Sequence, residues 1–168
     1  MERLAGAFIS SRESKQIMIL NYEPQHAEIQ FSVDDQEVLS AQIQRTMQQW
    51  IYSNRTRVMP RKMKELAQEE IGLLQQFLVT GEIDAVRERG KYLANEGFGT
   101  PTMVNLASTL RLGCWEIAAQ AADVTRFVAS LETYTAALLD GFLKAYEEDL
   151  CREQQRTYLS LTKSQSKL

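Results

Sequence analysis

The sequence predicts an all-α fold, and three observations lead to this prediction. The 168 residues include only three prolines and eight glycines, which favours long helices over a turn-rich β-structure. Apolar residues recur at intervals of three and four, the spacing of one helix face, over several long segments. No pair of segments alternates in the way that paired strands do. A chain of this length, with 44% hydrophobic residues, is expected to form one helical domain.

Composition and charge argue against several classes of protein. A formal net charge of −3 gives no general attraction to nucleic acid or to an anionic membrane. No stretch approaches the roughly 18–20 apolar residues of a membrane helix, and the N-terminus is too soon charged for a secretory signal. Cys114 and Cys151 form neither a metal-ligand spacing nor a disulfide framework. We therefore expect a cytoplasmic protein with free thiols.

The chain divides into an extension, a helical body and a tail. Residues 1–33 are expected to be an N-terminal extension with a short helix over 1–12, and the run IMIL at 17–20 fits either a strand or a buried extended segment. Residues 34–161 form the predicted domain. Residues 162–168 are polar and are expected to be a flexible tail.

Three helices are predicted in the first part of the domain. Asp34 and Glu37 have a capping-box spacing before an amphipathic helix over 34–53. Pro60 suits the first turn of a second helix that ends near 79. A third helix covers about 82–95, and Gly97 is expected to end it in the left-handed conformation.

The stretch EGFGTPTMVNLASTLRLGCWE (96–116) starts the next helix. Thr100 is expected to be its N-cap and Pro101 its first helical residue. The apolar stripe of this helix runs unbroken for about 30 Å at about 1.5 Å per residue. Gly113 lies within this helix at a cost of about 1 kcal/mol relative to alanine, which a close helix crossing or a pocket would explain. The stripe consists of Met103, Ala107, Leu110, Cys114, Ile117 and Ala121.

A final helix is predicted from Asp123 to about Leu161, close to 60 Å long at about 1.5 Å per residue. One side serves the core of the domain, through Phe127, Leu131, Tyr134, Leu138, Phe142 and Ala145. A second apolar side lies beside it and is expected to meet the same helix of another subunit. That predicted dimer interface consists of Leu139, Leu143, Tyr146 and Leu150.

The sequence gives little support for an enzyme or a metal protein. His26 is the only histidine, so no histidine pair for a metal or haem can be formed, and no phosphate-binding glycine motif occurs. The acidic pairs, such as Glu69 and Glu70, are interpreted as solvated helix faces. We therefore predict no catalytic residue, no metal site and no cofactor.

Two further groups of residues are candidate sites. Leu110, Cys114 and Trp115 are candidate lining of a pocket, with Cys114 interpreted as a buried inert thiol and Trp115 as packed at the edge of the core. Redox sensing or ligand attachment at Cys114 is the alternative. A basic segment forms either a solvated helix start or a docking patch for an acidic partner. It contains Arg55, Arg57, Arg61, Lys62 and Lys64.

The order of these features resembles the N-terminal sensor domains of the RsbR family, the stressosome proteins and related anti-sigma-factor antagonists. MQQWIYSN ends the first main helix, Gly97-Phe98 and Thr100-Pro101 precede a helix with leucines from Leu106 to Leu110, and YEEDLCREQQRTY resembles the exit helix of that family. The resemblance covers about residues 34–160. No STAS sequence follows Leu161 in this chain, and residues 1–33 lie outside the resemblance.

The resemblance implies a function. It implies a globin-like helical bundle without haem that dimerises and passes stress signals to a STAS output domain. A homodimer with STAS-type or kinase partners is therefore expected, while the small-molecule signal stays unspecified. The alternative is a cofactor-binding globin or a bilin-type protein, in which Cys114 or a tyrosine holds the prosthetic group.

Overall fold

The elements of the described chain are all helical, which confirms the predicted all-α class. The computed structural model describes residues 31–56, 58–119, 121 and 123–165, and no strand occurs among them. None of the helices in these ranges is both long and apolar enough to cross a membrane. The elements are α1 (Val33–Gln49), the 3₁₀ turn η1 (Ile51–Ser53), α2 (Pro60–Thr80), α3 (Ile83–Asn95), α4 (Thr100–Gly113), α5 (Trp115–Ala118) and α6 (Val124–Gln165).

The start of α1 lies slightly before the predicted one, because a different pair of residues forms its capping box. Ser32 is the N-cap, and its Oγ accepts a hydrogen bond from the backbone N–H of Asp35 at 3.1 Å. The Asp35 carboxylate accepts in return from the backbone N–H of Ser32 at 3.0 Å. The capping box was predicted at Asp34 and Glu37, which is wrong, since it lies two residues earlier. The segment after Gln49 tightens into η1 instead of continuing as α-helix.

The boundaries of α2 and α3 follow the proline and glycine signals. Pro60 is the first helical residue of α2, and Gly81 ends that helix in the left-handed region at φ 68°. Gly97 follows the end of α3 at φ 88°, which confirms its predicted conformation. Only glycine adopts such angles without a steric penalty from Cβ, which explains why both helices end there.

The start of α4 differs from the prediction, because its cap comes from a distant loop. Gly99, not Thr100, is the N-cap, and Thr100 is already helical. The Asn54 side chain supplies the missing acceptor: its Oδ1 accepts from the Gly99 N–H at 3.0 Å and from Thr102 Oγ1 at 2.7 Å. A Cβ at residue 99 would overlap the Ser53 carbonyl oxygen. The close approach of η1 therefore requires the glycine.

The predicted continuous helix over 100–121 is interrupted at Cys114, between α4 and α5. Helical hydrogen bonding still passes the interruption, since the Cys114 N–H donates to the Leu110 carbonyl at 3.0 Å and the Cys114 carbonyl accepts from Ala118. The apolar stripe consequently keeps its phase: its members from Met103 to Ile117 are buried, and Ala121 is partly buried.

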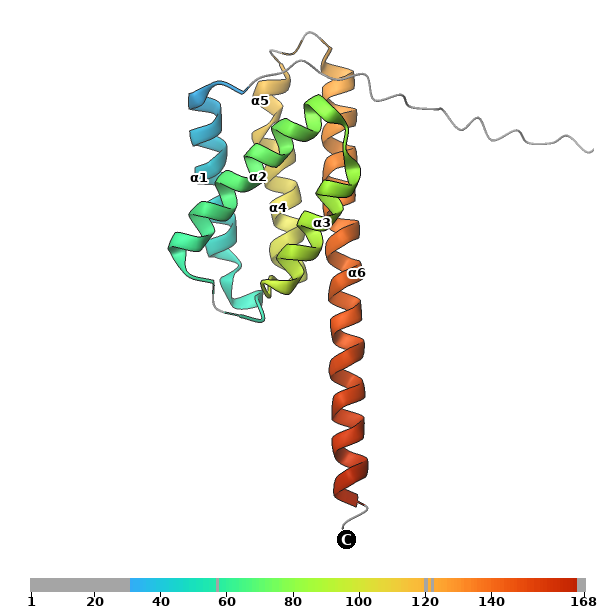
Figure 1. The fold of residues 1–168 in the computed structure, drawn as a ribbon. Helices are drawn as coiled ribbons and strands as arrows, with labels where there is room; N and C mark the ends of the chain where they lie inside the picture. The colour runs from blue at the N-terminus through green and yellow to red at the C-terminus, as the bar shows by residue number, and fades with distance from the viewer. Residues whose placement is uncertain (1–30, 57, 120, 122, 166–168) are drawn as a thin grey trace, which may run out of the picture.

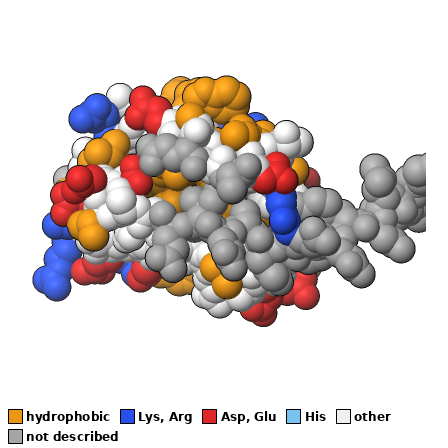
Figure 2. Space-filling model, turned by 90° about the horizontal axis from the view of Figure 1, so that it is seen from above, with side chains coloured by type: hydrophobic (Ala, Val, Ile, Leu, Met, Phe, Trp, Pro, Cys, Tyr) orange, Lys and Arg blue, Asp and Glu red, His pale blue; other side chains and the backbone are white. Residues whose placement is uncertain are grey.

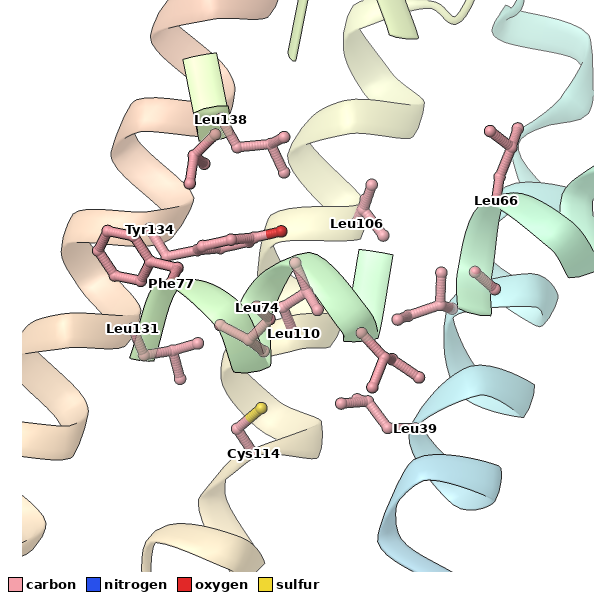
Figure 3. Packing of buried hydrophobic residues seen from close by; sticks show 14 of the residues in the cluster. Leu39, Leu66, Leu74, Phe77, Leu106, Leu110, Cys114, Leu131, Tyr134 and Leu138 are labelled. Atoms are coloured by element: carbon pink, nitrogen blue, oxygen red, sulfur yellow. The ribbon is translucent and has the colours of Figure 1, made fainter. Parts of the chain in front are cut away.

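The core lies between α6 and the other helices, as Figure 3 shows for part of it. Figure 1 shows α2 crossing in front of α4, with α1 on one side and α3 beside α6 on the other. The predicted core side of α6 is confirmed: Ala145 is partly buried against the core, and the other members are buried, namely Phe127, Leu131, Tyr134, Leu138 and Phe142. The helix continues to Gln165, beyond its expected end at Leu161. The predicted short helix, the IMIL run and His26 lie outside the described residues.

Candidate functional site at the base of the long helix

The most distinctive feature of the structure is the length of α6. Its 42 residues span about 63 Å at about 1.5 Å per residue. The N-terminal half packs on the body, while the C-terminal half extends well beyond it (Figure 1). Every side chain from Cys151 to Thr162 is exposed. Beyond Glu153, which pairs with Arg55, the helix therefore extends away from the body with its described side chains exposed.

Arg55 holds α6 at the point where the helix leaves the body. Its Nη1 lies 2.9 Å from Asp149 Oδ2, and its Nη2 pairs with the Glu153 carboxylate. The guanidinium also lies 5.7 Å from the centre of the Tyr146 ring, within range of a cation–π interaction. The half-exposed Arg55 side chain thus contacts two carboxylates one helical turn apart and one aromatic ring on α6.

The loop that carries Arg55 also contacts the turn between α3 and α4. The backbone N–H of Arg55 donates to the Gly97 carbonyl at 2.7 Å, and Thr56 Oγ1 donates to the Glu96 carbonyl at 2.5 Å. Thr56 occupies the space that a Cβ at Gly97 would need. Displacement of the α3–α4 turn would therefore move Arg55, and with it the contact to α6.

A buried ionic cluster fixes the middle of the packed half of α6. The Glu70 side chain on α2 is fully buried and accepts from Tyr134 Oη at 2.6 Å and from Arg89 Nε at 3.1 Å. Arg89 additionally donates to the Leu66 carbonyl at 3.0 Å and to Glu69 at 2.9 Å. In Figure 3 the Tyr134 hydroxyl points between the helices, away from solvent. The cluster joins α2, α3 and α6, and the two carboxylates share the positive charge of Arg89.

The cluster changes the protonation behaviour of its members. Burial, together with the negative charge of Glu70, raises the pKa of Tyr134 well above its ordinary value, so the phenol stays protonated and donates. Burial alone would lower the pKa of Arg89, but the charges and hydrogen bonds of Glu70 and Glu69 outweigh it and raise that pKa. Tyr134 and Arg89 are consequently fixed as donors across the physiological pH range.

The interpretation of Glu70 as part of a solvated face was wrong. Only Glu69 is exposed, whereas Glu70 is buried one residue further round α2. The helical spacing contained a signal, because Glu70 follows Ala67 by three residues and precedes Leu74 by four, and both are core residues. The partners Arg89 and Tyr134 have no such signal, since they come from other helices.

The four residues of the predicted dimer interface divide into two pairs. Leu139 and Tyr146 are half-buried and pack against the core of their own chain, where Tyr146 stacks on Phe142 with ring centres 5.5 Å apart. Leu143 and Leu150 are exposed, at 41% and 39%. The predicted interface therefore begins at the edge of the core and continues onto the free surface of α6.

The predicted pocket residues do not line one cavity. Leu110 and Cys114 are buried in the core, with the Cys114 sulfur pointing inward (Figure 3). Trp115 is 64% exposed and faces solvent, because it lies one residue round the helical path from the buried Cys114. A prosthetic group attached at Cys114 would have to displace core side chains. The placement of Trp115 at the edge of the core was also wrong.

The basic segment does not form one patch in the structure. Arg55 contacts α6, Arg61 pairs with Glu65 on its own helix, and the Lys62 ammonium lies 5.8 Å from the centre of the Tyr92 ring. Lys64 lies at a polar groove between α1 and α2 that has a volume of about 360 Å³. Arg57 lies outside the described residues. The structure thus assigns a definite partner on α6 only to Arg55.

Within the described ranges, no group of His, Cys, Asp and Glu side chains is arranged to hold a metal ion. Seen from the end opposite the protruding helix, charges of both signs are interspersed among the visible side chains (Figure 2). Comparison with protein-family profiles, curated proteins and solved structures found no match for this chain.

The two cysteines are expected to react with a thiol reagent at very different rates. Burial raises the pKa of the Cys114 thiol to about 12, whereas Cys151 is exposed on α6. Because the thiolate is the reactive form, Cys151 should be labelled rapidly at pH 8 and Cys114 only after unfolding. Labelling in native buffer and in denaturant, followed by mass spectrometry, measures this, with Cys151→Ser as the control. Faster labelling of Cys114 in the native state would contradict the assigned helix phase.

Proposed function

We propose that this chain is a non-enzymatic regulatory domain of the cytoplasm, globin-like in its helical body, which transmits a signal through α6. It acts as a homodimer, in the manner of the RsbR-type sensor domains that it resembles, and its partner is a STAS-type or kinase protein. The observation that carries the proposal is the uncovered continuation of α6 beyond the body.

The apolar pattern of α6 supports pairing with a second helix. Leu139, Leu150 and Leu161 are spaced by 11 residues, and the last two are exposed at 39% and 58%. An 11-residue repeat corresponds to about 3.67 residues per turn, so the stripe stays on one side of an almost straight helix. Between Leu139 and Leu150 the same side of the helix carries Leu143 and Tyr146. Between Leu150 and Leu161 the equivalent positions are the polar residues Gln154 and Thr157. Pairing is therefore strongest near the body.

The Arg55 loop supports a role in transmission. It contacts both the turn between α3 and α4 and the place where α6 leaves the body. A signal that moves this turn would change the contacts of Asp149 and Glu153, next to the apolar stripe. Half-exposed ion pairs contribute only up to about 1 kcal/mol, which suits a contact that has to form and break.

The dimer is tested by changing the stripe where it is exposed. Leu143→Asp with Leu150→Lys should convert a dimer into a folded monomer, because in a parallel helix pair each new charge faces the same charge on the partner helix. The mass is measured by light scattering and the fold by circular dichroism. Leu159→Asp is the matched control, since Leu159 is an exposed leucine (57%) on the other side of α6 and should leave the dimer intact.

A wild-type protein that is monomeric at high micromolar concentration would contradict the proposal. An absorbance spectrum of the purified protein distinguishes the proposed regulatory domain from the alternative, a protein that carries a prosthetic group. A Soret band or visible bilin absorption would favour the cofactor-binding globin or bilin-type protein.

A further inference from the structure

A groove of about 360 Å³ lies between α1 and the first part of α2. The second helix begins beside the end of α1 and runs back past it, so the groove follows both helices (Figure 1). The buried Ile71 supplies an apolar floor, and the volume is at the lower end of the range for small-molecule sites. Six polar side chains line this α1–α2 groove, namely Gln36, Glu37, Ser40, Gln44, Lys64 and Gln68.

Most of these polar side chains have no partner within the described part of the chain. Gln36 Nε2 donates to the Phe31 carbonyl at 3.1 Å, but the other five side chains form no hydrogen bond or ion pair with described residues. Glu37 and Lys64 therefore line the same groove without pairing with each other. Since a seam between two packed helices is ordinarily apolar, this lining favours a polar ligand that pairs with both charges.

The two charges lie toward opposite ends of the groove. Glu37 belongs to the first turns of α1, whereas Lys64 is near the start of α2, beside the end of α1. From Glu37 to Gln44 there are seven positions, about 10 Å along the axis of α1. Three extended residues of a peptide cover about the same length. The uncharged members of the lining, Ser40, Gln44 and Gln68, lie along this length.

We infer that the α1–α2 groove binds a short peptide of about three residues with free ends. The ammonium group of the peptide pairs with Glu37, and its carboxylate pairs with Lys64. The peptide groups between them each donate and accept, as do the glutamine amides and the Ser40 hydroxyl. A ligand with a single charge would leave either Glu37 or Lys64 without a partner.

As the site of a signal, the groove rests on the proposed function and specifies the class of ligand. A peptide that contacts both helices fixes α1 relative to the start of α2. Residues 50–59 connect these two helices and carry Arg55, which contacts α6. Binding in the groove thus reaches the place where α6 leaves the body.

Triglycine is the probe, because it offers both charges and the peptide groups without a side chain. Calorimetric titration of the full chain should show one saturable site. Glu37→Gln and Lys64→Gln should each weaken binding at least about tenfold, the usual loss for a hydrogen-bonded charge. Glu65→Gln is the matched control and should leave the affinity unchanged, since Glu65 is an exposed carboxylate next to Lys64 that does not line the groove.

Blocked peptides test the orientation of the ligand. N-acetyl-triglycine lacks the ammonium group, so it should bind the wild type at least about tenfold more weakly than triglycine, and Glu37→Gln should weaken it no further. Triglycine amide should behave in the same way toward Lys64→Gln. A general loss of folding would weaken all three peptides alike, and circular dichroism of the variants checks the fold.

The outcomes keep this inference separate from the proposed function. Absence of saturable binding at millimolar triglycine would overturn the inference, as would equal affinities of the Lys64→Gln and Glu65→Gln variants. Light scattering on the same samples gives the oligomeric state. A dimer that does not bind triglycine would overturn the site and leave the proposed function standing. A monomer that binds triglycine would overturn the proposed dimer and leave the site standing.

Discussion

Replacing Gly141 with alanine is expected to lower the free energy of unfolding by about 3 kcal/mol, at the upper end of the range for overpacked sites. A Cβ at Gly141 would overlap the Arg87 carbonyl oxygen and lie 2.8 Å from the Arg87 Cα. These are backbone atoms of α3, so no side-chain rotation relieves the overlap. The two helices would have to separate, and the core contacts between them would loosen.

Gly90 on α3, which faces α6 at the same helix crossing, gives a second position for the test. A Cβ at Gly90 would overlap the Leu138 carbonyl oxygen and lie 2.7 Å from the Phe142 nitrogen. Gly90→Ala should therefore destabilise the protein by a similar amount. The two helices approach each other backbone to backbone, and each contributes one glycine to the contact.

Gly72→Ala is the matched control for both variants. Gly72 lies within α2, and no heavy atom outside its own helix and chain neighbours lies within 4 Å of the position its Cβ would take. Alanine at such a site should stabilise the helix by up to about 1 kcal/mol. Urea unfolding followed by circular dichroism gives all three values. If Gly141→Ala proved as stable as Gly72→Ala, the close packing of α3 on α6 would be wrong.

The glycines illustrate what the sequence can and cannot predict. Gly81 and Gly97 lie between apolar-periodic segments, so their role in ending helices could be recognised from local spacing. The sequence also drew attention to Gly113 as a close crossing. A Cβ there meets only side chains, Gln42 and Leu39, which can move. The tighter crossing at Gly90 and Gly141 was missed, because the sequence does not show which helices touch.

In the candidate site, too, features within one helix could be predicted, whereas contacts between helices could not. The buried stripe of α6 and the exposure of its second side could be predicted from periodicity within one helix. The Arg55 contact joins residues 94 positions apart, and the Asn54 cap joins residues 45 apart. Such contacts depend on the packing of helices, for which one sequence gives no pattern. The capping error at Asp34 arose because several neighbouring residues had suitable side chains, whereas at Thr100 the capping acceptor comes from the distant Asn54.

The largest effect of a single substitution outside the glycines is expected at Arg89. Arg89→Met should lower the free energy of unfolding by about 3–5 kcal/mol, the cost of leaving a buried charge without its partner. The Glu70 carboxylate is fully buried, and only 11% of the Arg89 side chain is exposed, so water cannot replace the guanidinium without opening the core. Tyr134 donates one hydrogen bond to Glu70 and cannot neutralise its charge.

A double-mutant cycle shows whether the charge of Glu70 causes this loss. Arg89→Met also removes contacts to Glu69, Leu66 and Tyr92, whose loss does not depend on Glu70. In a Glu70→Gln background, Arg89→Met leaves no carboxylate buried without its partner, so it should cost at least about 2 kcal/mol less than in the wild type. Urea unfolding of the four proteins measures the difference. An equal cost in both backgrounds would mean that Arg89 stabilises the fold through its other contacts and that the buried ion pair is not what fixes α2, α3 and α6 together.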